Sequence, residues 1–162
     1  RTVTIGSQTW FRENLRYDVG RESRCLDDVT SNCERYGRLY TWPAAQRACP
    51  VGWHLPTEAD WQRLESFLGM DAAALSANEY RGVDQGARLR VGGDSGFDGL
   101  LSGYMRPDGT PRRANERAAL WTATEERPGE TSWHRDISAD PRVYRSPVDH
   151  GYYLSVRCIA DE

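Results

Sequence analysis

The sequence lacks lysine, long apolar runs and blocks of like charge. All 21 of its Lys and Arg residues are Arg, for which a GC-rich genome is the simplest explanation. No stretch approaches the ~20 consecutive apolar residues that a membrane-spanning helix needs, so we expect no membrane span in this chain. The net charge is only −3 and the signs are mixed along the chain, which argues against nucleic acid as a partner.

Hydrophobic residues are also scarce, at 38% of the 162 residues, but large aromatic residues compensate for them. Six Trp and eight Tyr favour an aromatic-rich core with many loops over a leucine-rich helix bundle. The length is typical of one domain, so we expect a single domain over residues 1–162. Because the chain opens at Arg1, without Met and inside a strand-like pattern, we expect a processed fragment of a longer exported protein.

The four cysteines indicate the cellular compartment in which the protein folds. They allow three pairings, of which we favour Cys25–Cys33, bracketing a polar surface loop, and Cys49–Cys158, joining an early helix to the last strand. The second bridge would add on the order of 4 kcal/mol to the free energy of unfolding, because it closes a long loop in the unfolded chain. A zinc site would need close pairs such as Cys-x2-Cys, which are absent. Two disulfides, and hence an oxidising compartment, are predicted.

Local patterns predict strands at both ends of the chain, two short helices and long loops. Residues 2–11 alternate around a Gly-Ser turn, which is typical of a β-hairpin. A proline opens a short helix at 44–49. A longer helix is predicted over 57–69, since Thr57 and Asp60 have the spacing of a capping box. Further strands are predicted at 36–42, 119–124, 132–137 and 152–159, with loops at 18–34 and 71–128.

Several segments match one family, in order, along nearly the whole chain. Residues 36–42 read Tyr-Gly-Arg-Leu-Tyr-Thr-Trp, and residues 48–57 read Ala-Cys-Pro-Val-Gly-Trp-His-Leu-Pro-Thr. Residues 155–158 read Ser-Val-Arg-Cys. With these segments the chain resembles the Fibrobacter succinogenes major paralogous domain, a family of exported bacterial modules in secreted or surface-anchored proteins. Other matching segments are 3–10, 13–15, 96–97, 101–104 and 120–124.

The resemblance implies a C-type-lectin-like fold, an α+β domain with twisted antiparallel sheets, two short helices and long loops, stapled by disulfides. In that fold a Cys on the first helix pairs with one in the final strand, which supports the Cys49–Cys158 pairing.

The sugar-binding lectins of this fold hold calcium with Glu-Pro-Asn or Gln-Pro-Asp and with Trp-Asn-Asp triplets, and none of these occurs here. Asp94, Asp98 and Asp108 lie in Gly-rich loops, where carboxylates are potential calcium ligands. We interpret them instead as turn-capping residues. We therefore expect no metal ion and no cofactor.

We also expect no enzyme activity and no catalytic residues, because no nucleophile–base pair or metal cluster assembles from the sequence. His54 precedes a helix, and we interpret it as a structural residue that bonds backbone groups. Formylglycine-generating enzymes share the broad fold, but their chemistry needs a reactive thiol. If the four cysteines form two disulfides, no free thiol remains in this chain.

The segment 125–153 holds the candidate ligand-binding residues. It is rich in Trp, Tyr and Arg, which dominate binding hot spots because they combine large contact area with directional hydrogen bonds. Alternation along the strand at 132–137 places Trp133 and Arg135 on one face, and His134 and Asp136 on the other. We predict that the ligand contacts Trp133, Arg135, Arg142, Tyr144, Arg145, Asp149 and Tyr152.

Two functions fit these observations. The first is an extracellular or cell-surface binding module, acting for example in adhesion, that recognises a protein or glycan through residues 125–153. The alternative is a structural subunit that assembles with copies of itself or with neighbouring domains in a surface appendage or filament. A related use of the fold, in the variable proteins of diversity-generating retroelements, displays residues that differ between copies just before the last strand.

Overall fold

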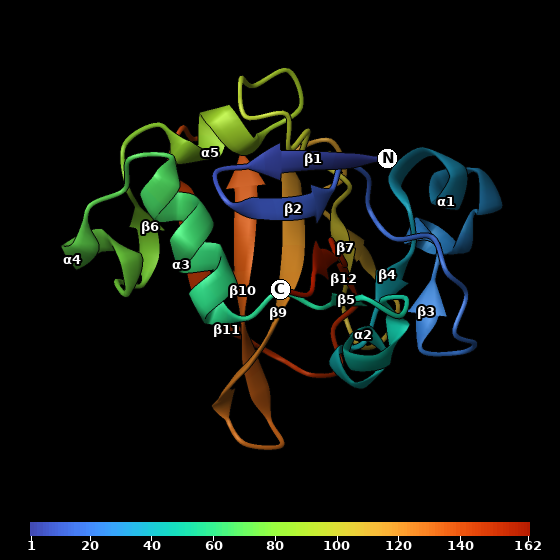
Figure 1. The fold of residues 1–162 in the computed structure, drawn as a ribbon. Helices are drawn as coiled ribbons and strands as arrows, with labels where there is room; N and C mark the ends of the chain where they lie inside the picture. The colour runs from blue at the N-terminus through green and yellow to red at the C-terminus, as the bar shows by residue number, and fades with distance from the viewer.

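Short helices surround one long, twisted sheet in this chain (Figure 1). The computed structural model describes residues 1–162. The α-helices are α1 (Thr30–Tyr36), α2 (Trp42–Ala48), α3 (Glu58–Phe67), α4 (Ala72–Leu75) and α5 (Gln85–Leu89), and a short 3-10 helix, η1, covers Leu26–Asp28. None of these helices has the length and apolar character needed to cross a membrane.

The largest sheet has seven strands in the order β3-β4-β12-β9-β10-β11-β6. Its long central strands are antiparallel neighbours, and the β9–β10 hairpin extends beyond the body of the domain (Figure 1). The β12–β9 pair is parallel, which corrects the expectation of purely antiparallel sheets. The cause is a crossover that carries the chain from β11 to the far side of β9. The strands are β3 (Ser23–Arg24), β4 (Leu39–Tyr40), β12 (Leu154–Ser155), β9 (Arg117–Arg127), β10 (Thr131–Ser138), β11 (Val143–Asp149) and β6 (Glu79–Arg81).

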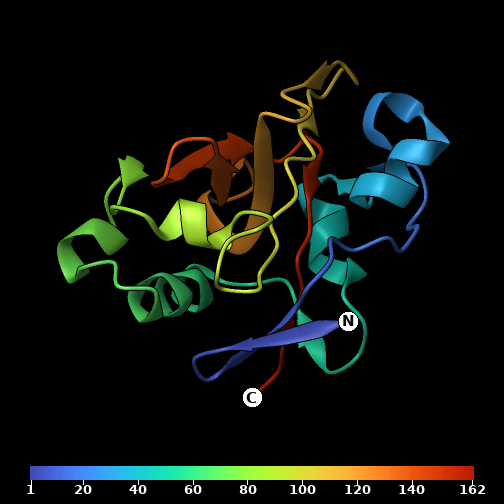
Figure 2. The same ribbon diagram turned by 90° about the horizontal axis from the view of Figure 1, so that it is seen from above.

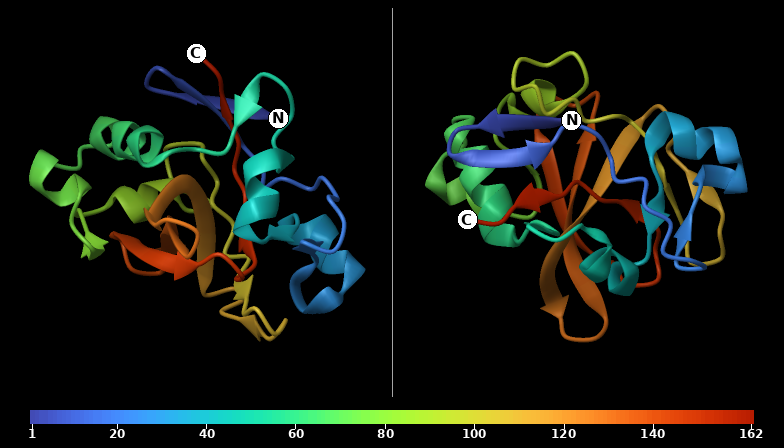
Figure 3. Two further views of the ribbon diagram at one scale, coloured as in Figure 1. Left: turned by 90° about the horizontal axis from the view of Figure 1, so that it is seen from below. Right: turned by 45° about the vertical axis from the view of Figure 1, so that its right-hand side comes forward.

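A second sheet gathers both ends of the chain in the order β1-β2-β13-β5. Its strands are β1 (Thr2–Ile5), β2 (Gln8–Phe11), β13 (Ile159–Ala160) and β5 (Trp53–His54), and a separate small hairpin pairs β7 (Tyr104–Met105) with β8 (Pro111–Arg112). The predicted N-terminal hairpin is confirmed. Figure 3 shows that the two termini lie on the same side of the molecule.

The predicted final strand at 152–159 is divided between the two sheets, as β12 and β13. Arg157 lies between the two strands and is fully buried. Its guanidinium donates to the Oδ1 atom of Asn14 at 2.9 Å and to the backbone carbonyl of Phe97. Burial lowers the pKa of Arg157, because it removes water from the charged guanidinium. The oxygens that accept its hydrogen bonds are neutral and do not offset this effect.

Different elements cover the two faces of the large sheet (Figure 2). On one face, α3 and the β1–β2 hairpin enclose a cluster in which Trp10, Trp61 and Phe97 have ring centroids 5.4–5.6 Å apart. On the other face, the alanines of α2 pack against Trp121 and Leu154. Because α2 is short and lies over β4, β12 and β9, the β10–β11 part of this second face stays uncovered.

The structure has five α-helices where the sequence predicted two. The two predicted helices, α2 and α3, are both present. The capping box of α3 is confirmed, since Thr57 Oγ1 accepts from the Asp60 amide at 3.1 Å and Asp60 Oδ2 accepts from the Thr57 amide at 2.9 Å. The additional helices have four to seven residues each, too few to display an apolar period.

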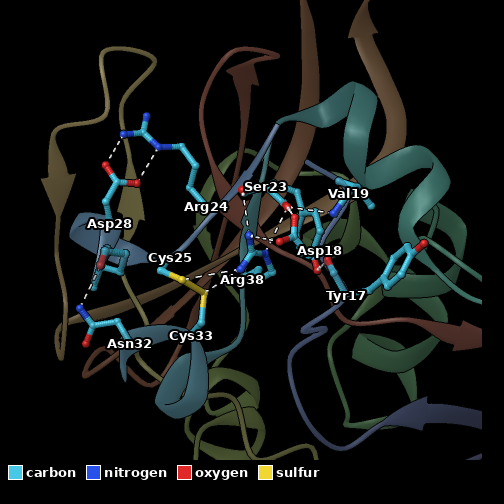
Figure 4. Close-up of a disulfide and its surroundings, with 12 residues drawn as sticks. Tyr17, Asp18, Val19, Ser23, Arg24, Cys25, Asp28, Asn32, Cys33 and Arg38 are labelled. Carbon is cyan, nitrogen blue, oxygen red and sulfur yellow. Dashed lines mark hydrogen bonds and ion pairs between the residues drawn. A yellow bond between two sulfur atoms is a disulfide. The ribbon is translucent and has the colours of Figure 1, made fainter. Parts of the chain in front are cut away.

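Both favoured disulfides are present, Cys25–Cys33 and Cys49–Cys158. The first joins the start of η1 to the middle of α1, within the segment predicted as a loop. Figure 4 shows the Arg38 guanidinium beside it, with Nη1 3.4 Å from Cys33 Sγ and Nη2 2.9 Å from Asp18 Oδ2. The second disulfide ties the end of α2 to the residue before β13.

Candidate functional site

The side chains of β10 and β11 point alternately to the two faces of the sheet, as predicted for residues 133–136. Arg135 and Arg145 are directly opposite each other in the β10–β11 ladder and both point toward α3. There they meet Glu58 and Glu65, which lie on the same side of α3 because they are two helical turns apart. Arg135 Nη2 lies 3.1 Å from Glu58 Oε2, and Arg135 Nε lies 3.1 Å from Glu65 Oε2.

This buried ionic network continues across the sheet. Arg145 Nε donates to Glu58 Oε2 at 2.9 Å, and Arg81 Nη2 donates to Glu65 Oε1 at 2.6 Å. Burial alone would raise the pKa of Glu58, but the adjacent Arg135 and Arg145 outweigh that effect and lower it. The network joins α3 to three strands of the sheet and keeps each buried charge paired.

Three of the predicted ligand residues therefore lie on the covered face. Arg135 is 0% exposed and Arg145 is 6% exposed, so the prediction that they contact a surface ligand is wrong. Trp133 is half-buried and covers the Arg145 guanidinium, whose central carbon lies 3.7 Å from the ring centroid. Sequence alternation separated the two faces correctly, but α3 covers the face that was selected.

The opposite, uncovered face holds a groove of about 200 Å³ on β9, β10 and β11. Its lining includes Ala119 and Leu154, which belong to the apolar cluster under α2. The polar and aromatic side chains in its lining include Tyr104, Arg117, His134, Asp136, Tyr144 and Tyr152.

Three polar side chains form the floor of the groove. Asp136 is only 4% exposed, and its Oδ2 accepts from Arg117 Nη1 at 2.9 Å. Its Oδ1 lies 3.2 Å from His134 Nε2, but the two atoms are not hydrogen-bonded and Oδ1 has no hydrogen-bond partner. His134 Nδ1 lies 2.8 Å from the carbonyl oxygen of Ser146. Because a carbonyl can only accept, Nδ1 carries a proton and donates it to the Ser146 carbonyl.

Tyrosine rings form the walls of the groove. Tyr104 of β7 and Tyr152, which precedes β12, have ring centroids 6.1 Å apart at one end. Tyr144 of β11 stands at the other end, where the Arg117 guanidinium lies 5.7 Å from its ring centroid. Asp136 and Tyr144 hold the Arg117 side chain in place. Because this side chain is still 28% exposed and lines the groove, it can donate hydrogen bonds to a ligand there. The site thus combines hydrogen-bond donors, acceptors and flat apolar surfaces.

Of the seven predicted ligand residues, only Tyr144 and Tyr152 line this groove. Arg142 is exposed and forms an ion pair with Asp140 at 2.8 Å. Asp149 is also exposed, and its Oδ1 accepts from the Gly151 amide at 2.8 Å, which fixes the turn that leads to Tyr152. The sequence interpretation missed Tyr104 and Arg117 and left out His134 and Asp136, although the alternation along β10 had placed the last two together.

The loop carboxylates considered as calcium ligands have other partners. Asp94 and Asp98 form ion pairs with arginines, and Asp108 Oδ1 accepts from the Thr110 amide at 2.8 Å, as a turn-capping residue does. His54 bonds carboxylates and not the backbone groups expected. Its Nδ1 lies 2.6 Å from Asp161 Oδ1, and its Nε2 lies 3.0 Å from Asp60 Oδ2.

Comparison with known proteins identifies a family. Residues 3–160 match the family model of the Fibrobacter succinogenes major domain. No curated protein and no solved structure matches the chain significantly. The matched region covers nearly the whole chain and includes every residue of the groove. The chain therefore belongs to the Fibrobacter succinogenes major domain family.

Proposed function

We propose that this chain is an extracellular, non-catalytic binding module whose ligand occupies the groove on β9, β10 and β11. The observation that carries the proposal is the buried polar floor of an open groove. Asp136 is nearly inaccessible, yet only one of its two oxygens has a hydrogen-bond partner. Burying a charge with incomplete hydrogen bonding costs stability, so such a group calls for an explanation, and at the floor of an open groove a bound ligand supplies one.

The walls support the same proposal. Tyrosine offers large, rigid contact area together with one polar group, and it is enriched where proteins bind ligands. Three tyrosines, Tyr104, Tyr144 and Tyr152, surround Arg117 in the groove. The groove lacks the paired nucleophile and base that a hydrolase needs, because no hydroxyl or thiol lies within hydrogen-bonding distance of His134 Nε2.

The proposal includes a C-type-lectin-like fold. Two features support this assignment. A long-range disulfide, Cys49–Cys158, links the end of a helix to the start of the last strand. In addition, strands from both ends of the chain share one sheet, through the pairing of Ile159 with Trp10.

The proposal also places the module outside the bacterial cell. Two disulfides support this location, since such bonds persist in oxidising compartments and are rare in the cytosol. Cys25–Cys33 closes only a short loop and Cys49–Cys158 a long one, so both local and global structure depend on oxidation. Reducing and non-reducing gels of the chain prepared from the culture medium and from cell extracts would test the location.

Glycan and cell-surface protein arrays test the binding function. We expect Tyr152→Ala and Asp136→Asn to weaken binding of any detected ligand by at least about tenfold, as central contacts do. The matched control is Tyr17→Ala, since Tyr17 is 62% exposed and lies outside the groove. Urea unfolding of each variant separates lost binding from lost folding.

Two results would overturn the proposal. The first is a ligand whose affinity is the same for the wild type, Tyr152→Ala and Asp136→Asn. The second is the absence of any ligand together with concentration-dependent polymerisation on size-exclusion chromatography. The second result would favour the alternative, a structural subunit of a surface appendage or filament.

A further inference from the structure

The groove does not end at Tyr144. A second, more open hollow lies beside it, and Arg117 lines both. Tyr80 of β6 lines the second hollow and meets Tyr144 edge-on, with ring centroids 5.1 Å apart. The shared Arg117 and the Tyr80–Tyr144 contact place the two hollows next to each other, and we refer to both together as the track.

Aromatic rings stand along the whole track. Tyr104 and Tyr152 form one pair at its first end, and Tyr144 and Tyr80 form another pair toward its second end. The polar floor with Arg117 lies between the pairs. A ligand that fills the track is therefore a chain. Its flat apolar faces lie on the tyrosine pairs, and hydrogen-bonding groups between these faces meet the polar floor.

The charges along the track disfavour anionic ligands. Its lining includes the carboxylates of Asp136, Glu116 and Asp140 but only one guanidinium, that of Arg117. That guanidinium is already paired with Asp136. The other two carboxylates are also paired, Asp140 with Arg142 and Glu116 with Arg113. An acidic chain would therefore find no unpaired guanidinium in this lining, whereas a neutral chain needs none.

The track also disfavours an extended peptide. Peptides that bind sheets usually add a strand at an edge, where unpaired backbone groups are available. Here the floor is the face of β10, whose backbone is paired with β9 on one side and β11 on the other. The recognition groups are side chains, namely the guanidinium of Arg117, which donates, and the ring nitrogen Nε2 of His134. Sugar hydroxyl groups satisfy both, since each can donate and accept.

We infer that the track from Tyr152 to Tyr80 binds a neutral oligosaccharide of two or more units, with sugar faces stacked on the tyrosines and hydroxyl groups at Arg117 and His134. This inference rests on the proposed binding function and specifies its ligand. It requires that affinity increases with chain length until both hollows are filled. It also requires that Tyr80 matters only for ligands long enough to reach it.

The test is isothermal titration of the full chain with glucose, mannose and xylose oligosaccharides, from the monosaccharide to the hexasaccharide. Oligogalacturonides of the same lengths serve as acidic counterparts. We expect Tyr152→Ala to weaken binding of every length of the preferred neutral sugar. Tyr80→Ala should weaken binding of the longer oligomers by about fivefold, the worth of one aromatic contact, and leave the monosaccharide unchanged. Tyr80→Phe, which keeps the ring, should bind all lengths like the wild type.

Three results would overturn the inference. Affinity that does not depend on chain length, or Tyr80→Ala binding the hexasaccharide like the wild type, would exclude the second hollow. Tighter binding of the oligogalacturonides would exclude a neutral ligand. Failure of every sugar, together with groove-dependent capture of a protein on the arrays, would overturn the glycan assignment and leave the proposed binding function intact.

Discussion

Replacing Arg135 with Ala tests whether this residue stabilises the fold or binds a ligand. The sequence predicted a ligand contact, but the structure buries the side chain. Its side chain is 0% exposed and contacts both Glu58 and Glu65. Without it, each glutamate loses one of two arginine partners in the interior. Removing one member of a buried ionic network typically costs about 3–5 kcal/mol, because the remaining charges stay buried and incompletely paired. For a domain of this length, the melting temperature should fall by roughly 10 °C.

Urea unfolding with both disulfides intact measures this cost, with the fluorescence of the six tryptophans as the signal. The matched control is Arg142→Ala, since Arg142 forms an exposed ion pair with Asp140 in the turn before β11. Its loss should change the free energy of unfolding by less than about 1 kcal/mol. The reasoning fails if Arg135→Ala is as stable as Arg142→Ala. A stable Arg135→Ala that no longer bound its ligand would restore the original assignment.

Three further changes test other parts of the structure. Replacing Cys49 and Cys158 with Ala should lower the free energy of unfolding by about 4 kcal/mol in urea, more than removal of the shorter bridge, because the larger loop restricts the unfolded chain more. Burial lowers the pKa of His54, but the hydrogen bonds that its ring donates to the carboxylates of Asp161 and Asp60 outweigh burial and raise the pKa above its usual value. The stability that protonated His54 contributes is thus complete below about pH 6.5 and is lost as the pH rises through the raised pKa. Unfolding midpoints should fall more steeply across this window for the wild type than for His54→Gln, and equal slopes would refute the assignment. Gly37 and Gly52 both have a positive φ, but a Cβ at Gly37 would meet a backbone oxygen at 2.8 Å while one at Gly52 meets nothing. Gly37→Ala should therefore cost about 1–3 kcal/mol more than Gly52→Ala in urea unfolding.

The sequence predicted well those elements whose signals are local. The α3 helix has a capping box and an apolar stripe of Trp61, Leu64, Phe67 and Leu68. All of these are buried as predicted except Phe67, which is 62% exposed. The hairpin at the N-terminus alternates around a tight turn. The disulfides followed from spacing and from the family resemblance. Each of these features is specified by residues that are close in sequence or by a pattern shared along the chain.

The groove could be predicted only in part, because it depends on contacts between distant elements. Alternation assigned Arg135 and His134 to opposite faces, but nothing near them in sequence says which face α3 covers. The decisive partners, Glu58 and Glu65, are about 70 residues away from Arg135. Tyr104 lay in a segment interpreted as loop. Strand β11 was also missed, since it contains Pro147, a residue that is disfavoured within a sheet.

The Cys49–Cys158 bridge has a mechanical consequence for a module exposed to pulling. Tension applied between the two ends of the chain passes from residue 49 to residue 158 through the disulfide and bypasses everything between them. Only the segments outside this covalent loop can be drawn out, which is less than about a third of the contour length. The β1–β2 hairpin would peel away from β13 first. Tyr80, Arg117, Asp136 and Tyr152 all lie inside the bypassed loop, so the chain segment that forms the groove would not itself be drawn out under load.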